Sequence, residues 1–201
     1  MSTQQVIGQY VTREQTSHKR ALLVIDVQNE YFTGQMPVTY PPQAQERVLQ
    51  AIDIARQAKI PVIVIQHTID QVAPVFQKGT HGWALHESIA HLPADFYIEK
   101  KLPSSFTGTE LEHYLRNQQI DTVVISGYMT QMCCDTTARY AFHLGFNVEF
   151  LADATATLGF SNQAGTISAE ELHKAILIVQ ASRFSRVLRV DEWAAQFAIA
   201  P

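Results

Sequence analysis

The sequence predicts an α/β protein with a six-stranded, mostly parallel sheet flanked by helices on both faces. The main observation is that short apolar runs alternate with longer amphipathic stretches along the whole chain. Strands separated by helices pair in parallel and are covered on both faces. The length of 201 residues fits one α/β domain, so we expect a single domain over 1–201 with an N-terminal extension at 1–19.

The elements follow in order along the chain. The sequence predicts strands at 21–27, 62–66, 96–99, 122–126, 147–151 and 186–190, and helices at 44–59, 109–118, 133–144 and 168–182. Pro61 follows the first helix, Thr109 and Glu112 have the spacing of a capping box, and Gly145 is typical of a helix C-cap. The stretch 67–95 is long and irregular, and inside a compact domain such a loop is usually functional.

Composition excludes several classes of protein. Hydrophobic residues make up 46% of the chain and charged residues only 17%, and the net charge is −4, which argues against nucleic acid or an anionic membrane as the main partner. The first 20 residues contain no apolar core of a signal peptide, and no apolar run is long enough to span a bilayer. Cys133 and Cys134 are adjacent and rarely bond to each other in that position, so we expect free thiols and a cytoplasmic protein.

Three reactive side chains lie at predicted strand or helix ends. Asp26 ends the first strand, Lys100 follows the third, and Cys133 lies seven residues after the fourth, where a helix begins. Ligands of such sheets bind beyond the carboxyl ends of the strands, where the strand order reverses. If strands one, three and four have neighbouring carboxyl ends, the three side chains meet in one cleft.

Together these residues form a coherent catalytic set. A helix N-terminus and a nearby ammonium lower the pKa of a thiol, Asp26 can take the thiol proton, and Lys100 can hold the carboxylate ionised. Backbone N–H groups in the turn at 128–133 can stabilise an oxyanion. Each residue alone also has a structural explanation, because Asp26 can cap a helix, Lys100 can be solvated, and Cys133 can be a small core residue.

Three segments resemble the isochorismatase-like cysteine hydrolases, and the resemblance spans about residues 20 to 190. The segments are ALLVIDVQNEYF (21–32), IEKKLPSSFTGTELEHYL (98–115) and SGYMTQMCCDTTARYAFHLGFNVEFLADATAT (126–157). The family includes nicotinamidases, N-carbamoylsarcosine, ureidoacrylate and maleamate amidohydrolases, and isochorismatases. The resemblance implies a six-stranded parallel sheet. Together with the low proportion of charged residues, it also implies a homodimer or homotetramer.

The resemblance also implies a catalytic triad of Asp26, Lys100 and Cys133. The family lysine stands six residues before a phenylalanine, here Phe106, which selects Lys100 over Lys101. The family cysteine stands four residues before a threonine, here Thr137, which selects Cys133 over Cys134.

The family further has a non-proline cis peptide bond after strand four, here Tyr128–Met129. The resemblance implies that this turn directs the N–H groups of Met129 and Cys133 at the oxyanion.

A metal is not expected. Nicotinamidases carry an Asp-x-His pair and a further His after strand two, whereas residues 66–74 read QHTIDQVAP and retain only His67. The set of His67, Asp70, His81 and His86 has no standard ligand spacing, so we predict neither metal nor cofactor.

Phe32, Trp83 and Tyr128 are candidate pocket walls for a small planar substrate, together with His67. Phe106 is a weaker candidate, and all these aromatic residues can instead belong to the core or to a subunit interface.

The sequence therefore predicts a cysteine-dependent hydrolase that cleaves an amide or ureido C–N bond of a small molecule through a thioester. Two alternatives stay open at this point. One is vinyl-ether hydrolysis, as in true isochorismatases, which can lack the cysteine. The other is a catalytically silent binding protein of the same fold.

Overall fold

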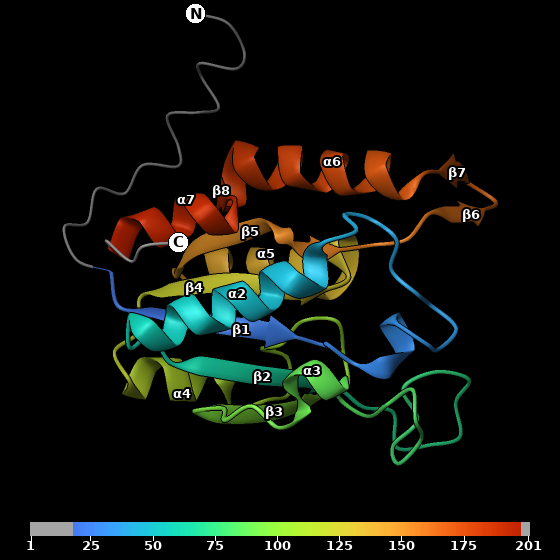
Figure 1. Ribbon diagram of the computed structural model, residues 1–201, viewed down its shortest axis with the longest axis horizontal. Coiled ribbons are helices and arrows are strands. Elements are labelled where there is room, and N and C mark those ends of the chain that lie inside the picture. Colours follow the sequence, from blue (N-terminus) through green and yellow to red (C-terminus); the bar gives the residue numbers. More distant parts are fainter. Residues whose placement is uncertain (1–17, 198–201) are drawn as a thin grey trace, which may run out of the picture.

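The computed structural model describes residues 18–197, and its core is a six-stranded sheet in the order β3-β2-β1-β4-β5-β8 (Figure 1). Every neighbouring pair in this sheet is parallel. The strands are β1 (Arg20–Ile25), β2 (Val62–His67), β3 (Phe96–Lys100), β4 (Thr122–Tyr128), β5 (Asn147–Ala156) and β8 (Arg186–Leu188). Most of the predicted extension at 1–19 lies outside the described residues, so the domain boundaries stay a prediction.

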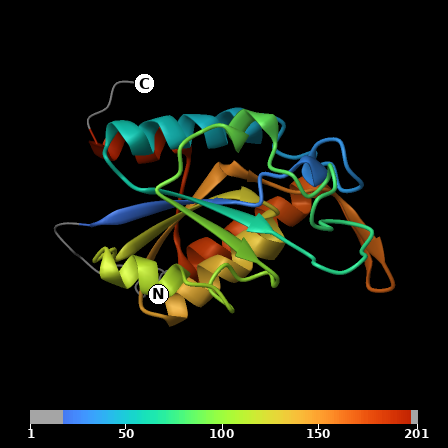
Figure 2. The same cartoon turned by 90° about the horizontal axis from the view of Figure 1, so that it is seen from below.

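Helices cover both faces of the sheet, as predicted. Figure 2 shows α2 (Ala44–Gln57) and α7 (Val190–Ala194) on one face, and α4 (Leu111–Asn117) and α5 (Asp135–His143) on the other. The side chains of β1 alternate between the two layers, because successive residues of a strand point to opposite faces. Leu22 and Val24 pack with α2, whereas Leu23 and Ile25 pack with α4 and α5. None of the helices between residues 18 and 197 is long and apolar enough to cross a membrane.

Several local features differ from the sequence prediction. The short helix α3 (Glu87–Ala90), the hairpin of β6 (Phe160–Asn162) and β7 (Gly165–Ile167), and α7 were not predicted. The capping box at Thr109 and Glu112 is wrong, because α4 begins only at Leu111. The Thr109 hydroxyl donates to Ser105 O at 2.6 Å in the loop that precedes the helix, and it accepts from the Leu111 N–H at 3.3 Å.

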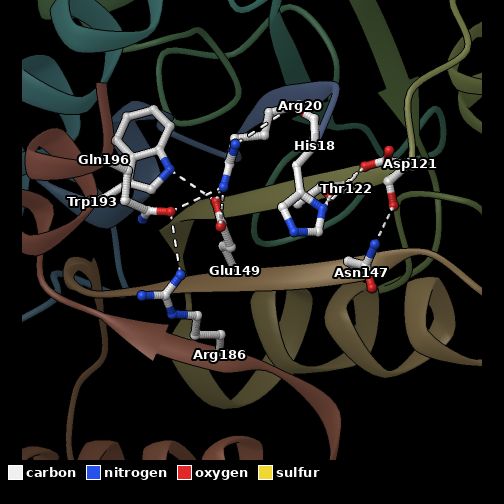
Figure 3. Close-up of polar contacts among 9 residues, drawn as sticks. All are labelled: His18, Arg20, Asp121, Thr122, Asn147, Glu149, Arg186, Trp193 and Gln196. Carbon is white, nitrogen blue, oxygen red and sulfur yellow. Dashed lines mark hydrogen bonds and ion pairs between the residues drawn. The ribbon is translucent and has the colours of Figure 1, made fainter. Parts of the chain in front are cut away.

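A partly buried ion pair joins the amino-terminal parts of β1 and β5 (Figure 3). Arg20 at the start of β1 binds both carboxylate oxygens of Glu149 in β5, each at 2.8 Å. The Trp193 indole N–H donates to the same carboxylate at 2.9 Å, and Gln196 Oε1 accepts from Arg20 and Arg186. These contacts tie the C-terminal segment to the sheet at the edge opposite the ends that carry Asp26 and Lys100.

Candidate active site

The site lies where the strand order reverses, between the carboxyl ends of β1 and β4. Ile25 pairs with Gly127, and a Cβ on Gly127 would lie 2.0 Å from Ile25 O, so no other residue fits there. Gly127 also has φ +107°, which other residues rarely adopt. Asp26 follows directly in the left-handed region with φ +52°, a conformation that aspartate tolerates better than most residues. This close approach brings Asp26 beside the turn that carries Cys133.

Asp26, Lys100 and Cys133 meet in a fully buried cluster. Lys100 Nζ lies 2.7 Å from Asp26 Oδ2 and donates to Cys133 Sγ at 3.1 Å. The side chains of Lys100 and Asp26 are both 0% exposed. The three carboxyl ends are not all neighbours, because β2 lies between β3 and β1. The lysine is long enough to reach past the end of β2, so the residues meet although their strands are not adjacent.

His67, the last residue of β2, is the third acceptor of the Lys100 ammonium. The distance from Nζ to His67 Nδ1 is 3.1 Å. An ammonium can only donate, so Nδ1 must hold a lone pair and Nε2 must carry the proton. Burial and the Lys100 charge both lower the pKa of His67, which keeps the ring in this neutral form. His67 thus holds the lysine rather than standing apart from it.

Cys133 is a protonated thiol in this site. Burial and the Asp26 carboxylate raise the pKa of Cys133 well above its usual value, and the opposing effect of Lys100 does not cancel them. The sequence led us to expect a lowered pKa, which is wrong because desolvation outweighs the ammonium. Burial opposes the charge of Lys100 as well, but Asp26 and Cys133 raise its pKa overall. If Cys133 acts as a nucleophile, its proton therefore has to leave during the reaction.

Asp26 can receive that proton. Neither of its carboxylate oxygens has a well-aligned hydrogen-bond donor among residues 18–197, although Oδ2 forms the ion pair with Lys100. Oδ1 therefore keeps lone pairs that can accept a proton from the thiol or from a water molecule. A buried carboxylate with an unfilled acceptor position is costly, so such a group is a candidate for a functional role.

The neighbours of the two reactive residues have different surroundings. Cys134 is fully buried in the core, and its N–H donates to Met129 O. Lys101 has a 71% exposed side chain and pairs with Asp70. Cys133 lies in a short π-helical turn, η2 (Thr130–Cys134), that precedes α5, rather than in the α-helix itself. The Tyr128–Met129 bond before this turn is cis, as the resemblance implied.

Aromatic side chains surround the cluster, and two of them were missed by the sequence analysis. Tyr31 is buried, and its ring lies 5.3 Å from Phe76 and 5.7 Å from Tyr128. Burial raises the pKa of Tyr31, and the carboxylate of Asp26 adds to this effect. Phe76 in turn contacts the His67 ring at 5.1 Å. The only signal for Tyr31 was its place inside the segment 21–32.

The residues predicted to form the pocket wall differ in burial and in the rings that they contact. Phe32 is half-buried and contacts the rings of Tyr128 and His86. Tyr128 is completely buried, and its hydroxyl has no partner within residues 18–197. Phe106 is a core residue that stacks on Tyr140 and Phe146.

Trp83 is fixed by a hydrogen-bond network that the sequence did not reveal. Its indole N–H donates to Thr68 Oγ1 at 2.9 Å, and its carbonyl accepts from the amides of Gln28 and Gln66. Gln28 also bonds the backbone of His67 through both its oxygen and its nitrogen. The long loop after β2 is therefore held against the ends of β1 and β2.

The donor atoms do not fit a metal ion. Within the described ranges, one group of donors lies close enough for a metal, and it consists of Asp26, His67 and Cys133 within 4.8 Å of one another. The Lys100 ammonium already contacts all three. A divalent cation there would have to displace a buried positive charge, so no step of the reaction is assigned to a metal.

The other histidines of the predicted loop lie elsewhere. His81 contacts Thr33 and His86 caps α3, and both line a separate cavity of about 490 Å³.

Comparison with known proteins identifies the family. The Isochorismatase domain matches residues 20–191, so the chain belongs to the isochorismatase family. It is 32% identical to Nicotinamidase 3 of Arabidopsis thaliana, over 91% of this chain and 92% of that protein. It is 28% identical to the ureidoacrylate amidohydrolase RutB of Stutzerimonas stutzeri, over 90% and 84%.

Solved structures agree with this assignment. The chain matches an isochorismatase-type crystal structure from Burkholderia xenovorans LB400 with a TM-score of 0.89 and 44% identity, covering 90% of this chain and 88% of the other. It also matches the pyrazinamidase/nicotinamidase of Streptococcus mutans with a TM-score of 0.71 and 25% identity, covering 84% and 99%. The predicted family, the α/β fold and the assignment to the hydrolases are therefore confirmed.

Proposed function

We propose that the protein is a cysteine amidohydrolase that cleaves an amide or ureido C–N bond of a small molecule, with Asp26, Lys100 and Cys133 as its catalytic triad. The observation that supports this most is a single buried ammonium, Lys100 Nζ, in contact with both Asp26 and Cys133. The nicotinamidase and the ureidoacrylate amidohydrolase among the relatives support the same class of bond.

In the first half-reaction, Asp26 accepts the proton of the Cys133 thiol while the sulfur adds to the carbonyl carbon. Negative charge forms on the carbonyl oxygen, which the backbone N–H groups of Met129 and Cys133 stabilise. The C–N bond then breaks and Asp26 gives its proton to the leaving nitrogen. Ammonia or an amine departs, and the acyl group stays on Cys133 as a thioester.

In the second half-reaction, a water molecule adds to the thioester and Asp26 takes its proton. The C–S bond breaks, the proton returns to the sulfur, and the acid product leaves. Lys100 keeps its proton throughout, because no step requires it. We propose neither a cofactor nor a metal for this sequence of steps.

The substrate pocket has aromatic walls in this proposal. Phe32, Trp83 and Tyr128 hold a small planar substrate beside His67, and Tyr31 joins them. The ring contacts of Tyr31 and Phe32 with Tyr128 support a common wall. The single-domain organisation over 1–201 is part of the same proposal.

We also infer a cytoplasmic homodimer or homotetramer that acts on a small molecule rather than on nucleic acid or a membrane. The two free thiols support a reducing compartment. The helix α6 (Ala169–Val179) exposes Ile178 by 69% and Val179 by 39%, which supports a subunit contact. Light scattering measures the oligomeric state, and a monomer at micromolar concentration contradicts this part.

The function is tested by ammonia release from a panel of amides and ureides that includes nicotinamide, ureidoacrylate and maleamate. We expect turnover of at least one compound and its loss in Cys133→Ala, whereas the matched variant Cys134→Ala retains activity. Pyruvate release from isochorismate without ammonia from any amide indicates vinyl-ether hydrolysis instead. Wild-type turnover by Cys133→Ala refutes the proposed nucleophile.

A further inference from the structure

The helix α6 carries one buried side chain that the proposed reaction does not use. Of the eleven residues of α6, only His173 is buried, with 3% of its surface exposed. The helix packs against η2, the turn that contains Cys133. A buried imidazole is costly unless both of its nitrogens find partners, so these partners indicate what the side chain does.

Both ring nitrogens of His173 are hydrogen-bonded, and the partners fix the tautomer. Nε2 lies 3.0 Å from the carbonyl oxygen of Ala152 in β5, which can only accept, so Nε2 carries the proton. Nδ1 then holds a lone pair and accepts from the Thr130 hydroxyl at 2.9 Å. Burial lowers the pKa of His173 to about 4, so the ring stays neutral and keeps this arrangement near neutral pH.

Thr130 belongs to the backbone segment that binds the oxyanion in the proposed mechanism. It is fully buried and is the first residue of η2, between Met129 and Cys133. These are the two residues whose N–H groups face the oxyanion in the proposed mechanism. The next residue, Gln131, is held separately, because its Oε1 accepts from Thr157 at 2.7 Å. The hydrogen bond from Thr130 to His173 therefore holds the first residue of the turn by its side chain.

We propose that His173 is a positioning residue, which acts through Thr130 to hold the Met129 and Cys133 N–H groups in place for the oxyanion. The inference rests on the proposed function, because it assumes carbonyl addition by Cys133. The hydrogen bonds of His173 go to Thr130 and Ala152 and not to the thiol or to Asp26. Its loss therefore impairs addition to a carbonyl and leaves the nucleophilicity of the sulfur unchanged.

Two reagents separate these effects. The acylation of Cys133 by p-nitrophenyl acetate passes through an oxyanion, whereas its alkylation by iodoacetamide does not. We expect His173→Leu and Thr130→Val each to slow acylation by about tenfold. This loss of rate is smaller than the loss that follows when an oxyanion donor itself is removed. Alkylation stays close to the wild-type rate. Thr130→Ser retains the hydroxyl and retains most of the acylation rate.

The controls use neighbouring residues. Lys174→Ala alters the next position of α6, an exposed lysine paired with Glu170, and leaves both rates unchanged. The double variant of Thr130→Val and His173→Leu is no slower than either single variant, because both remove the same hydrogen bond. If His173→Leu does not fold, the pair Thr130→Val and Thr130→Ser carries the same comparison.

Four results overturn the proposal. Acylation and alkylation that fall together indicate a general loss of structure, and unchanged acylation indicates that the contact is not needed. Additive effects in the double variant show that the two side chains act separately. A wild-type protein whose Cys133 is not acylated at all contradicts the proposed function itself, and the inference fails with it.

Discussion

Replacing Lys100 by methionine tests the centre of the site, because the side chain becomes only one atom shorter and loses its charge and its three polar contacts. The variant leaves the carboxylate of Asp26 buried without a counter-ion. It also removes the donors to Cys133 and His67. We expect the variant to lose both catalytic turnover and stability, for the same electrostatic reason.

The structure gives the scale of the stability loss. Both partners of the ion pair are 0% exposed, so solvent does not compensate the remaining charge. Removing one partner of a buried pair costs about 3–5 kcal/mol in the free energy of unfolding. For a chain of this size, such a loss lowers the melting temperature by roughly 6–20 °C.

The adjacent lysine is a matched control. Lys101 differs from Lys100 by one position but is 71% exposed and pairs with Asp70 at the surface. Lys101→Met is therefore expected to leave the free energy of unfolding close to that of the wild type. The double variant Asp26→Asn with Lys100→Met removes both charges, and asparagine tolerates the positive φ of this position. It is expected to regain most of the lost stability and no activity.

The assay is urea unfolding followed by tryptophan fluorescence, with ammonia release measured on the same preparations. Equal stability of Lys100→Met and Lys101→Met refutes the buried ion pair. A double variant as unstable as Lys100→Met shows that the loss comes from packing rather than from an uncompensated charge.

Three further predictions concern other parts of the molecule. Cys133→Ser lowers the rate of ammonia release by at least about a thousandfold, whereas Cys134→Ser stays within about fivefold of wild type. Equal rates of ammonia release in the two variants exclude Cys133 as the nucleophile. Because the pKa of Cys133 is raised, the protonated thiol dominates below that pKa, so the ultraviolet difference between wild type and Cys133→Ser shows no thiolate below about pH 9. A thiolate step near neutral pH contradicts this. Glu149→Gln weakens the pair with Arg20 and lowers the free energy of unfolding by about 2–4 kcal/mol in urea, with kcat unchanged, and a parallel fall in kcat shows that this edge is coupled to the site.

Much of the fold could be predicted, because the strands are fully buried apolar runs. The sequence placed Asp26 just after such a run and Cys133 before a helix, and the reversal of strand order brings both to one point. It could not give the order of the strands. The position of β2 between β1 and β3 follows from packing across the whole sheet, and so does the reach of Lys100 over its end.

Other parts of the site depend on tertiary contacts that leave no local signal. Tyr31 resembles a core residue in sequence and becomes part of the site only through its contacts with Tyr128 and Phe76. In the sequence, His173 is an ordinary polar residue of an exposed helix. Only its burial and its hydrogen bond with Thr130 indicate a role. Thr109 has the spacing of a capping box with Glu112, but its hydroxyl bonds Ser105 O and the Leu111 N–H. In each case a distant segment determines what the side chain does.

In the proposed mechanism, the charges of the buried cluster allow a proton to move without solvent. Before the reaction it holds a carboxylate, an ammonium and a neutral thiol. Transfer of the thiol proton to Asp26 gives a carboxylic acid, an ammonium and a thiolate, so the net charge of the buried site does not change. A low dielectric penalises a net charge far more than a paired one. Lys100 Nζ lies 2.7 Å from Asp26 Oδ2 and 3.1 Å from Cys133 Sγ. The lysine can therefore stabilise the anion on either residue, and a neutral His67 beside it adds no further charge to the site.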